Sequence, residues 1–143
     1  MARQTGAVSF RIDDWMLGLF LSDLPPQPDL KWIAERTQRC EHLIWSVCLQ
    51  LLALGTDVVL DLGLMQREDR ERVMTRAQSV GINVQAYFID AAEDIRRQRV
   101  LARNAERGET YSFTVTPEMF NFMERVYEAP CATERQLSVL VET

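Results

Sequence analysis

Short runs of branched and aromatic residues alternate along the chain with longer segments that carry apolar residues at steps of three and four. The first three runs are Ala7–Ile12, Asp57–Gly63 and Val84–Ile89, and their length and composition predict β-strands. Leu137–Val141 predicts a last strand. The unbroken apolar run within Asp57–Gly63 is typical of a parallel strand covered on both faces.

Helical periodicity predicts four helices, Leu30–Leu54, Gln66–Val80, Ala91–Arg107 and Pro117 to about Tyr127. The first follows a proline-rich loop; we expect it to be capped by Asp29 and to end before a C′ glycine, Gly55. Its predicted buried stripe consists of Ile33, Thr37, Cys40, Ile44, Val47 and Leu51. From Leu43 onward this helix is apolar nearly all round, so we expect its second half to be buried on several sides.

Thr116, Pro117 and Glu118 have the pattern of a helix start, with a capping hydroxyl, a first-turn proline and an acid that the helix dipole favours. The residues predicted to face inward on this helix are Met119, Phe120, Met123 and Val126.

The predicted order is strand, helix, strand, helix, strand, helix, helix, strand. Helices between consecutive strands force parallel pairing, so the chain is expected to be one α/β domain with a mainly parallel sheet between helical layers. The 143 residues suit a single domain. Ligands of such sheets collect beyond the carboxyl ends of the strands, where the sequence places Asp13, Asp14, Asp61 and Asp90.

The composition is that of an ordinary globular protein, with 47% hydrophobic and 26% charged residues. A net charge of −5 argues against nucleic acid as the main partner. The longest apolar stretch, Leu43–Leu54, is shorter than the ~20 residues of a membrane span, and the first residues lack a signal-peptide core, so we expect a cytoplasmic protein. The three cysteines, Cys40, Cys48 and Cys131, are expected to be buried, reduced thiols.

The acids at the strand ends have two interpretations each. Asp13 or Asp14 would accept a proton from a substrate hydroxyl or hold Mg²⁺ through water, or would cap the following turn. Asp61 ends an apolar strand as the acid of a Walker B strand does, although many parallel strands end in an acid. Trp15 would line a substrate pocket or close the core.

An arginine stripe lies on the predicted third helix at steps of three, four and four. Its members are Arg96, Arg99, Arg103 and Arg107. Guanidinium groups on one face repel one another unless anions or acids lie among them, and phosphate matches their fork geometry. The alternative is a solvated face paired with Glu93, Asp94 and Glu106.

Three segments together resemble small P-loop proteins described as AAA-family ATPases or kinases, similar to the chloramphenicol phosphotransferase and zeta toxin group. They are Arg11–Trp15, Val58–Gly63 and Arg99–Gly108. The resemblance covers nearly the whole chain. It implies ATP and Mg²⁺ as cofactors, a small-molecule substrate, Asp13 (or Asp14) facing the substrate hydroxyl and Asp61 supporting the metal. It also implies that arginines of a lid helix, here Arg99, Arg103 and Arg107, close over the phosphates.

The sequence departs from this group because it contains no G-x-x-x-x-G-K-[ST] loop, whose backbone cradles the phosphates. In the group the strand before that loop lies in the middle of the sheet, between the strands corresponding to Val58–Leu62 and Val84–Ile89. Without it, we expect weak nucleotide binding and unpaired strand edges, which either close together or are filled by another segment. A second copy of the chain is the expected partner.

Three functions remain open on the sequence alone. The chain is a kinase-like ATP-binding protein, a non-enzymatic oligomeric remnant of one, or a module that binds an anion or phosphometabolite through the arginine stripe.

Overall fold

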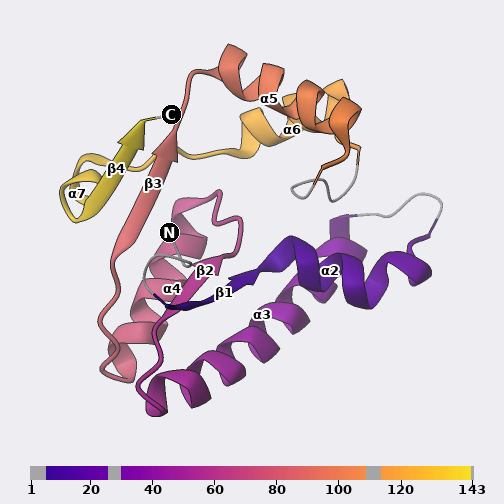
Figure 1. The fold of residues 1–143 in the computed structure, drawn as a ribbon. Helices are drawn as coiled ribbons and strands as arrows, with labels where there is room; N and C mark the ends of the chain where they lie inside the picture. Colours follow the sequence, from indigo (N-terminus) through magenta and orange to yellow (C-terminus); the bar gives the residue numbers. More distant parts are fainter. Residues whose placement is uncertain (1–5, 26–29, 109–113, 143) are drawn as a thin grey trace. The chain divides into compact units, whose positions relative to one another are not determined.

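The computed structural model describes the chain apart from residues 1–5, 26–29, 109–113 and 143. The chain divides into two compact units, Met1–Gly63 and Leu64–Thr143. Each unit contains one pair of parallel strands (Figure 1).

The first unit holds two strands joined through helices. Its elements are β1 (Val8–Arg11), α2 (Ile12–Phe20), the 3-10 turn η1 (Leu21–Asp23), α3 (Leu30–Ala53) and β2 (Val58–Asp61). β1 and β2 pair in parallel, with Val8 opposite Val58 and Arg11 opposite Asp61. The connection between them carries α3, as a parallel crossover requires. α2 packs against α3 (Figure 1).

The buried residues of this unit confirm part of the predicted stripe of α3. Cys40 and Ile44 are each 1% exposed, and so is Cys48, which the predicted stripe did not include. Burial raises the pKa of the Cys40 and Cys48 thiols, so both are protonated at neutral pH. The Cys40 thiol lies 3.9 Å from the Met16 sulfur of α2 and joins the two helices.

Other residues of α3 are more exposed than predicted. Ile33 is 40% exposed, and Leu43 and Leu49 in the second half are 49% and 37% exposed. The expectation that this half is buried on several sides is therefore wrong at these positions. Gly55 adopts a positive φ of 75° just after the helix, as expected of a C′ glycine. The predicted cap Asp29 lies outside the described residues.

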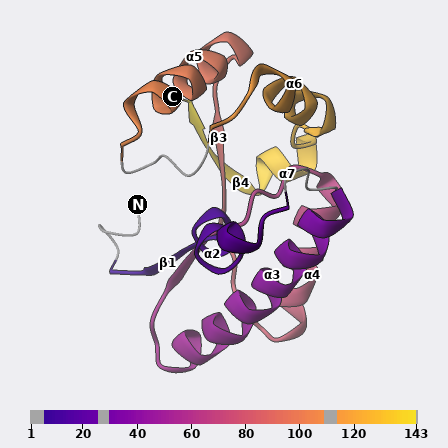
Figure 2. The same cartoon turned by 90° about the vertical axis from the view of Figure 1, so that its right-hand side faces the viewer.

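The second unit holds the other strand pair and four helices. Its elements are α4 (Arg67–Ser79), β3 (Ala86–Asp90), α5 (Glu93–Glu106), α6 (Pro117–Val126), α7 (Ala132–Gln136) and β4 (Ser138–Glu142). β3 and β4 pair in parallel over their full length, from Ala86 opposite Ser138 to Asp90 opposite Glu142. Figure 1 shows α7 beside β4 on the side away from β3, and Figure 2 shows the same helix at the start of β4.

The predicted start of α6 is confirmed. The Thr116 hydroxyl accepts a hydrogen bond from the Met119 N–H at 3.3 Å, and Pro117 is the first helical residue. Among the residues predicted to face inward, Phe120 is buried at 7% exposure and Val126 is half-buried. Met119 and Met123 remain 43% and 42% exposed, so their predicted burial is wrong.

The α/β class and the parallel pairing of the strands are confirmed, whereas two helices were not predicted. The strand predicted to extend to Ile12 ends at Arg11, because Ile12 begins α2. The short helix α7 between α6 and β4 was also missed. Within the described residues the strands form two two-stranded sheets; the three-layer arrangement and the single domain stay predictions.

Among the described helices, none has an apolar stretch long enough to cross a membrane.

Candidate functional site

Three acids lie near the carboxyl ends of β1 and β2, as predicted. Asp61 is the last residue of β2 and lies opposite Arg11, the last residue of β1. Asp13 and Asp14 follow in the first turn of α2. All three acidic side chains are exposed, so a ligand at this end of the strand pair would meet carboxylates in contact with water.

Asp13 and Asp14 are positioned by a helix, because α2 begins at Ile12, directly after β1. In the first turn of α2 their charges complement the positive end of the helix dipole. Asp14 also forms an ion pair with Arg11 at 3.5 Å. Both side chains of this pair are exposed, so it contributes little to stability. This geometry gives both acids a structural role at the helix start.

Trp15 follows these acids and is half-buried. Its ring centroid lies 6.3 Å from that of Phe10, which is 8% exposed, and the two rings are tilted by 50°. Aromatic pairs of this geometry are typical of packed interiors. The contact favours the interpretation of Trp15 as a core residue over that of a pocket wall.

A metal site made of protein ligands alone is not formed by the part of the chain that the structure describes, since no three His, Cys, Asp or Glu residues gather closely enough. Mg²⁺ is usually held by one or two carboxylates together with substrate phosphates and water. Asp61, exposed at a strand end, fits that kind of shared coordination.

The arginine stripe is divided by its contacts with α6. Arg96 pairs with Glu124 at 2.6 Å, and its guanidinium lies 5.8 Å from the Tyr127 ring centroid. Arg97, next to the stripe, pairs with Glu93 at 2.9 Å and lies over the Phe120 ring at 4.4 Å. These contacts hold α5 against α6. The arginines in the first turns of α5 therefore stabilise the packing of the two helices.

The end of the stripe shares one feature with its start. The Nε atoms of Arg103 and Arg96 are both buried without a hydrogen-bond partner among the described residues, and a buried unpaired donor costs about 1–3 kcal/mol. Arg99 and Arg107 each have a polar or ring interaction within the structure. Arg107 ends α5 in a left-handed conformation with φ of 48°, and its N–H donates to the Arg103 carbonyl at 3.1 Å.

Asn104 fixes the chain that follows α5. Its side-chain amide donates to the Val115 carbonyl at 2.8 Å, and its oxygen accepts from the Val115 N–H at 3.1 Å. This pair of hydrogen bonds ties the end of α5 to the residue before the α6 cap, so Arg103 lies where the two helices are joined.

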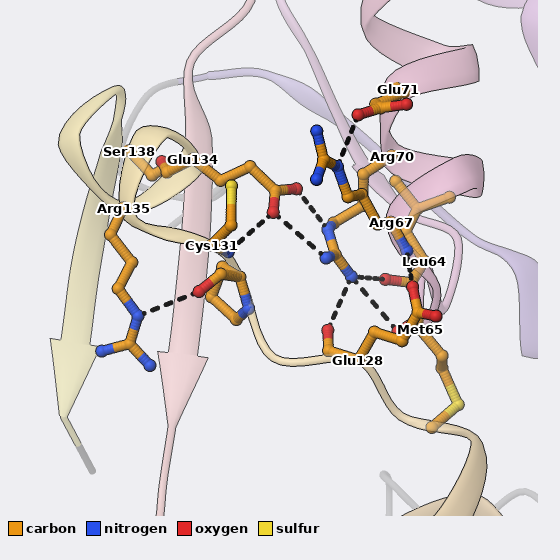
Figure 3. Close-up of polar contacts among 11 residues, drawn as sticks. Leu64, Met65, Arg67, Arg70, Glu71, Glu128, Cys131, Glu134, Arg135 and Ser138 are labelled. Atoms are coloured by element: carbon orange, nitrogen blue, oxygen red, sulfur yellow. Dashed lines mark hydrogen bonds and ion pairs between the residues drawn. The ribbon is translucent and has the colours of Figure 1, made fainter.

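The most enclosed charged group, Arg70 of α4, was not predicted from the sequence. Arg70 is 7% exposed and forms a two-point ion pair with Glu134 of α7, at 2.7 and 3.3 Å (Figure 3). Its Nη1 donates to the carbonyls of Met65 and Glu128 at 3.2 and 3.0 Å. The guanidinium thus joins α4, α7 and the two segments that lead into them.

The Arg70 guanidinium holds the pKa of Glu134 far below its usual range, at about 2. The Cys131 N–H also donates to Glu134, at 2.8 Å, and stabilises the carboxylate. The same ion pair raises the pKa of Arg70. No local sequence signal could identify this pair, since its members are 64 residues apart.

A small cavity lies at the carboxyl ends of β3 and β4, between Asp90, Glu142, Tyr127 and Arg135. Its volume is about 40 Å³. A water molecule needs roughly 10–15 Å³ measured this way, so the cavity holds a few waters at most. Asp90 is the last residue of β3, as predicted, and this cavity beside it is too small to enclose a nucleotide.

A family model described as an AAA domain matches residues 1–130. The chain belongs to this family. AAA domains of this kind are P-loop, kinase-like nucleotide-binding proteins that generally use ATP and Mg²⁺. Comparisons with curated proteins and with solved structures give no match.

The match includes the acids of the first unit and the arginines of α5, without assigning a role to any one of them, whereas Glu134, Arg135 and Glu142 lie beyond it. Within the first unit, Asp13, Asp14 and Asp61 lie at one end of the strand pair. Within the second unit, Arg99, Arg103 and Arg107 lie on α5. The structure therefore contains two separate candidate groups, an acidic group in the first unit and a basic group in the second.

Proposed function

We propose that this AAA domain belongs to a lineage of kinase-like, small-molecule phosphotransferases. We also propose that the 143 residues alone bind ATP poorly. The family match over residues 1–130 carries the proposal, because it relates the chain to nucleotide-binding, kinase-like proteins. The reason for poor binding is chemical. The sequence has no G-x-x-x-x-G-K-[ST] loop, so the backbone amides, lysine and hydroxyl that normally grip the phosphates are missing from it.

The retained groups fit the remaining steps of phosphoryl transfer. Asp13, with Asp14 as the alternative, would accept the proton of the substrate hydroxyl and orient its oxygen for attack. Asp61 would hold Mg²⁺ together with the phosphates, and the bound metal would neutralise charge on the phosphate oxygens. Arg99, Arg103 and Arg107 would close over the transferred group, since guanidinium forks match phosphate oxygens.

A second candidate is supported by Arg103, because Arg96, whose Nε is also buried without a hydrogen-bond partner among the described residues, is already paired with Glu124. The buried Nε of Arg103 has no hydrogen-bond partner in the described part of the chain and is a donor that an anion would satisfy. The chain would then be a module that binds an anion or phosphometabolite without turnover.

Calorimetric titration with Mg-ATP tests the first proposal. The 143-residue chain is compared with a chain extended to include any upstream phosphate-binding loop. We expect at least tenfold weaker binding by the shorter chain, which is about 1.4 kcal/mol. Equal affinity of the two chains would contradict the proposal, because the missing loop would then be irrelevant.

Titration with pyrophosphate tests the second candidate. Arg103→Ala should abolish binding, whereas Arg125→Ala, which removes an exposed arginine from α6, should not change it. Unchanged binding by Arg103→Ala would eliminate the anion site, and equal losses in both variants would indicate non-specific charge attraction.

A further inference from the structure

One strand of the second unit has an edge that pairs with no other strand among the described residues. β3 pairs with β4 along one edge, from Ala86 to Asp90, and has no strand partner on the other edge within the described residues. Backbone N–H and C=O groups on a free edge can pair with another strand. The outer side of β4 differs, because α7 contacts β4 and lies on its side away from β3 in Figure 1.

Two side chains of β3 are also exposed. Tyr87 is 46% exposed and Ile89 is 72% exposed, although both belong to the strand types that prefer burial. The strand carries no lysine, no proline and no charge before Asp90. Natural sheets normally protect a free edge with such residues. By contrast, Val58, Val59 and Leu60 of β2 are half-buried, so β2 is the weaker candidate.

We propose that the free edge of β3 pairs with the same edge of a second copy of this chain, antiparallel, across a two-fold axis at Phe88. This inference does not depend on the proposed phosphotransferase function. It would join two strand pairs into one four-stranded sheet in the order β4-β3-β3-β4.

The register at Phe88 is self-complementary. Tyr87 of one copy lies opposite Ile89 of the other, and aromatic pairs with β-branched residues stabilise antiparallel strands. Asp90 lies opposite Ala86, so no two carboxylates face each other. Every second residue of a strand directs its backbone N–H and C=O groups to the same edge. Whichever residues of β3 face the free edge, the two-fold axis at Phe88 places them opposite the equivalent residues of the second copy. A parallel, in-register arrangement would instead place the two Asp90 carboxylates side by side.

Sedimentation equilibrium of the 143-residue chain tests the pairing over a range of protein concentrations. We expect a monomer–dimer equilibrium in wild type. Ile89→Lys should raise the dissociation constant at least tenfold, because it places two positive charges at the interface. The control is Leu137→Lys, whose side chain is also 72% exposed but lies just before β4, and it should leave the constant unchanged.

Cysteine pairing tests the register itself and does not depend on the effect of a charge. Directly opposite residues on antiparallel strands have Cβ atoms roughly 4.5–5.5 Å apart. Mixing the Tyr87→Cys and Ile89→Cys variants should therefore give a disulfide-linked dimer faster than either variant alone. A wild-type chain that stays monomeric, equal effects of the two lysine variants, or no preference for the mixed disulfide would each overturn the proposal.

Discussion

Glu134 is paired with the buried Arg70, which keeps its carboxylate ionised. The stability of the fold therefore depends on pH. The pKa of Glu134 is about 2 in the folded protein and near 4.5 when the group is free. Between these values the unfolded chain binds a proton that the folded chain does not. The stabilisation is therefore complete above about pH 4.5 and is lost as the pH falls toward 2.

Glu134→Gln should remove this dependence. We expect wild type to be more stable than the variant at pH 6, and the difference to shrink as the pH falls from 5 to 2. Urea unfolding at a series of pH values measures it. The matched control is Glu71→Gln, which alters the ion pair of Arg67 with Glu71 on the same helix as Arg70. That pair is as short, at 2.6 Å, but exposed, so its removal should have little effect. A pH-independent difference between wild type and Glu134→Gln would contradict the assignment.

At the scale of the element, a single hydroxyl decides where α6 begins. The Thr116 side chain accepts from the Met119 N–H, which otherwise has no partner in the first turn of the helix. Thr116→Ala should destabilise the protein by about 1 kcal/mol, measured by urea unfolding at neutral pH. Thr116→Ser keeps the oxygen and should stay near wild type. If both variants lose the same stability, the cap is not the cause.

The start of α6 was predictable because a cap, a proline and an acid are consecutive in the sequence. α2 was not, because the branched residues before Asp13 continue the pattern of a strand, and only the contact with α3 shows that Ile12 already belongs to a helix. α7 has five residues, which is too short for helical periodicity to appear. The acids and arginines of the candidate site could be located by spacing, whereas their partners could not. Arg96 is bound by Glu124, 28 residues away.

At the scale of the whole molecule, the two units have separate strand pairs and separate spectroscopic probes. All three tryptophans, Trp15, Trp32 and Trp45, belong to the first unit. The Arg70–Glu134 pair belongs to the second. Because each unit has its own buried residues, we expect each to unfold as its own cooperative unit.

Arg70→Met provides the perturbation that separates the two units. It leaves Glu134 without its guanidinium and the carbonyls of Met65 and Glu128 without a donor, which should cost about 2–3 kcal/mol. Hydrogen exchange in peptides from α4 and β4 should then accelerate, while the tryptophan fluorescence transition in urea keeps its midpoint. Arg67→Met, which breaks only an exposed pair, should change neither signal. If the urea midpoint of tryptophan fluorescence falls together with the hydrogen-exchange protection of β4, the two units unfold as one. A loss of stability confined to the second unit changes the unfolding of the first only when the two units are energetically coupled.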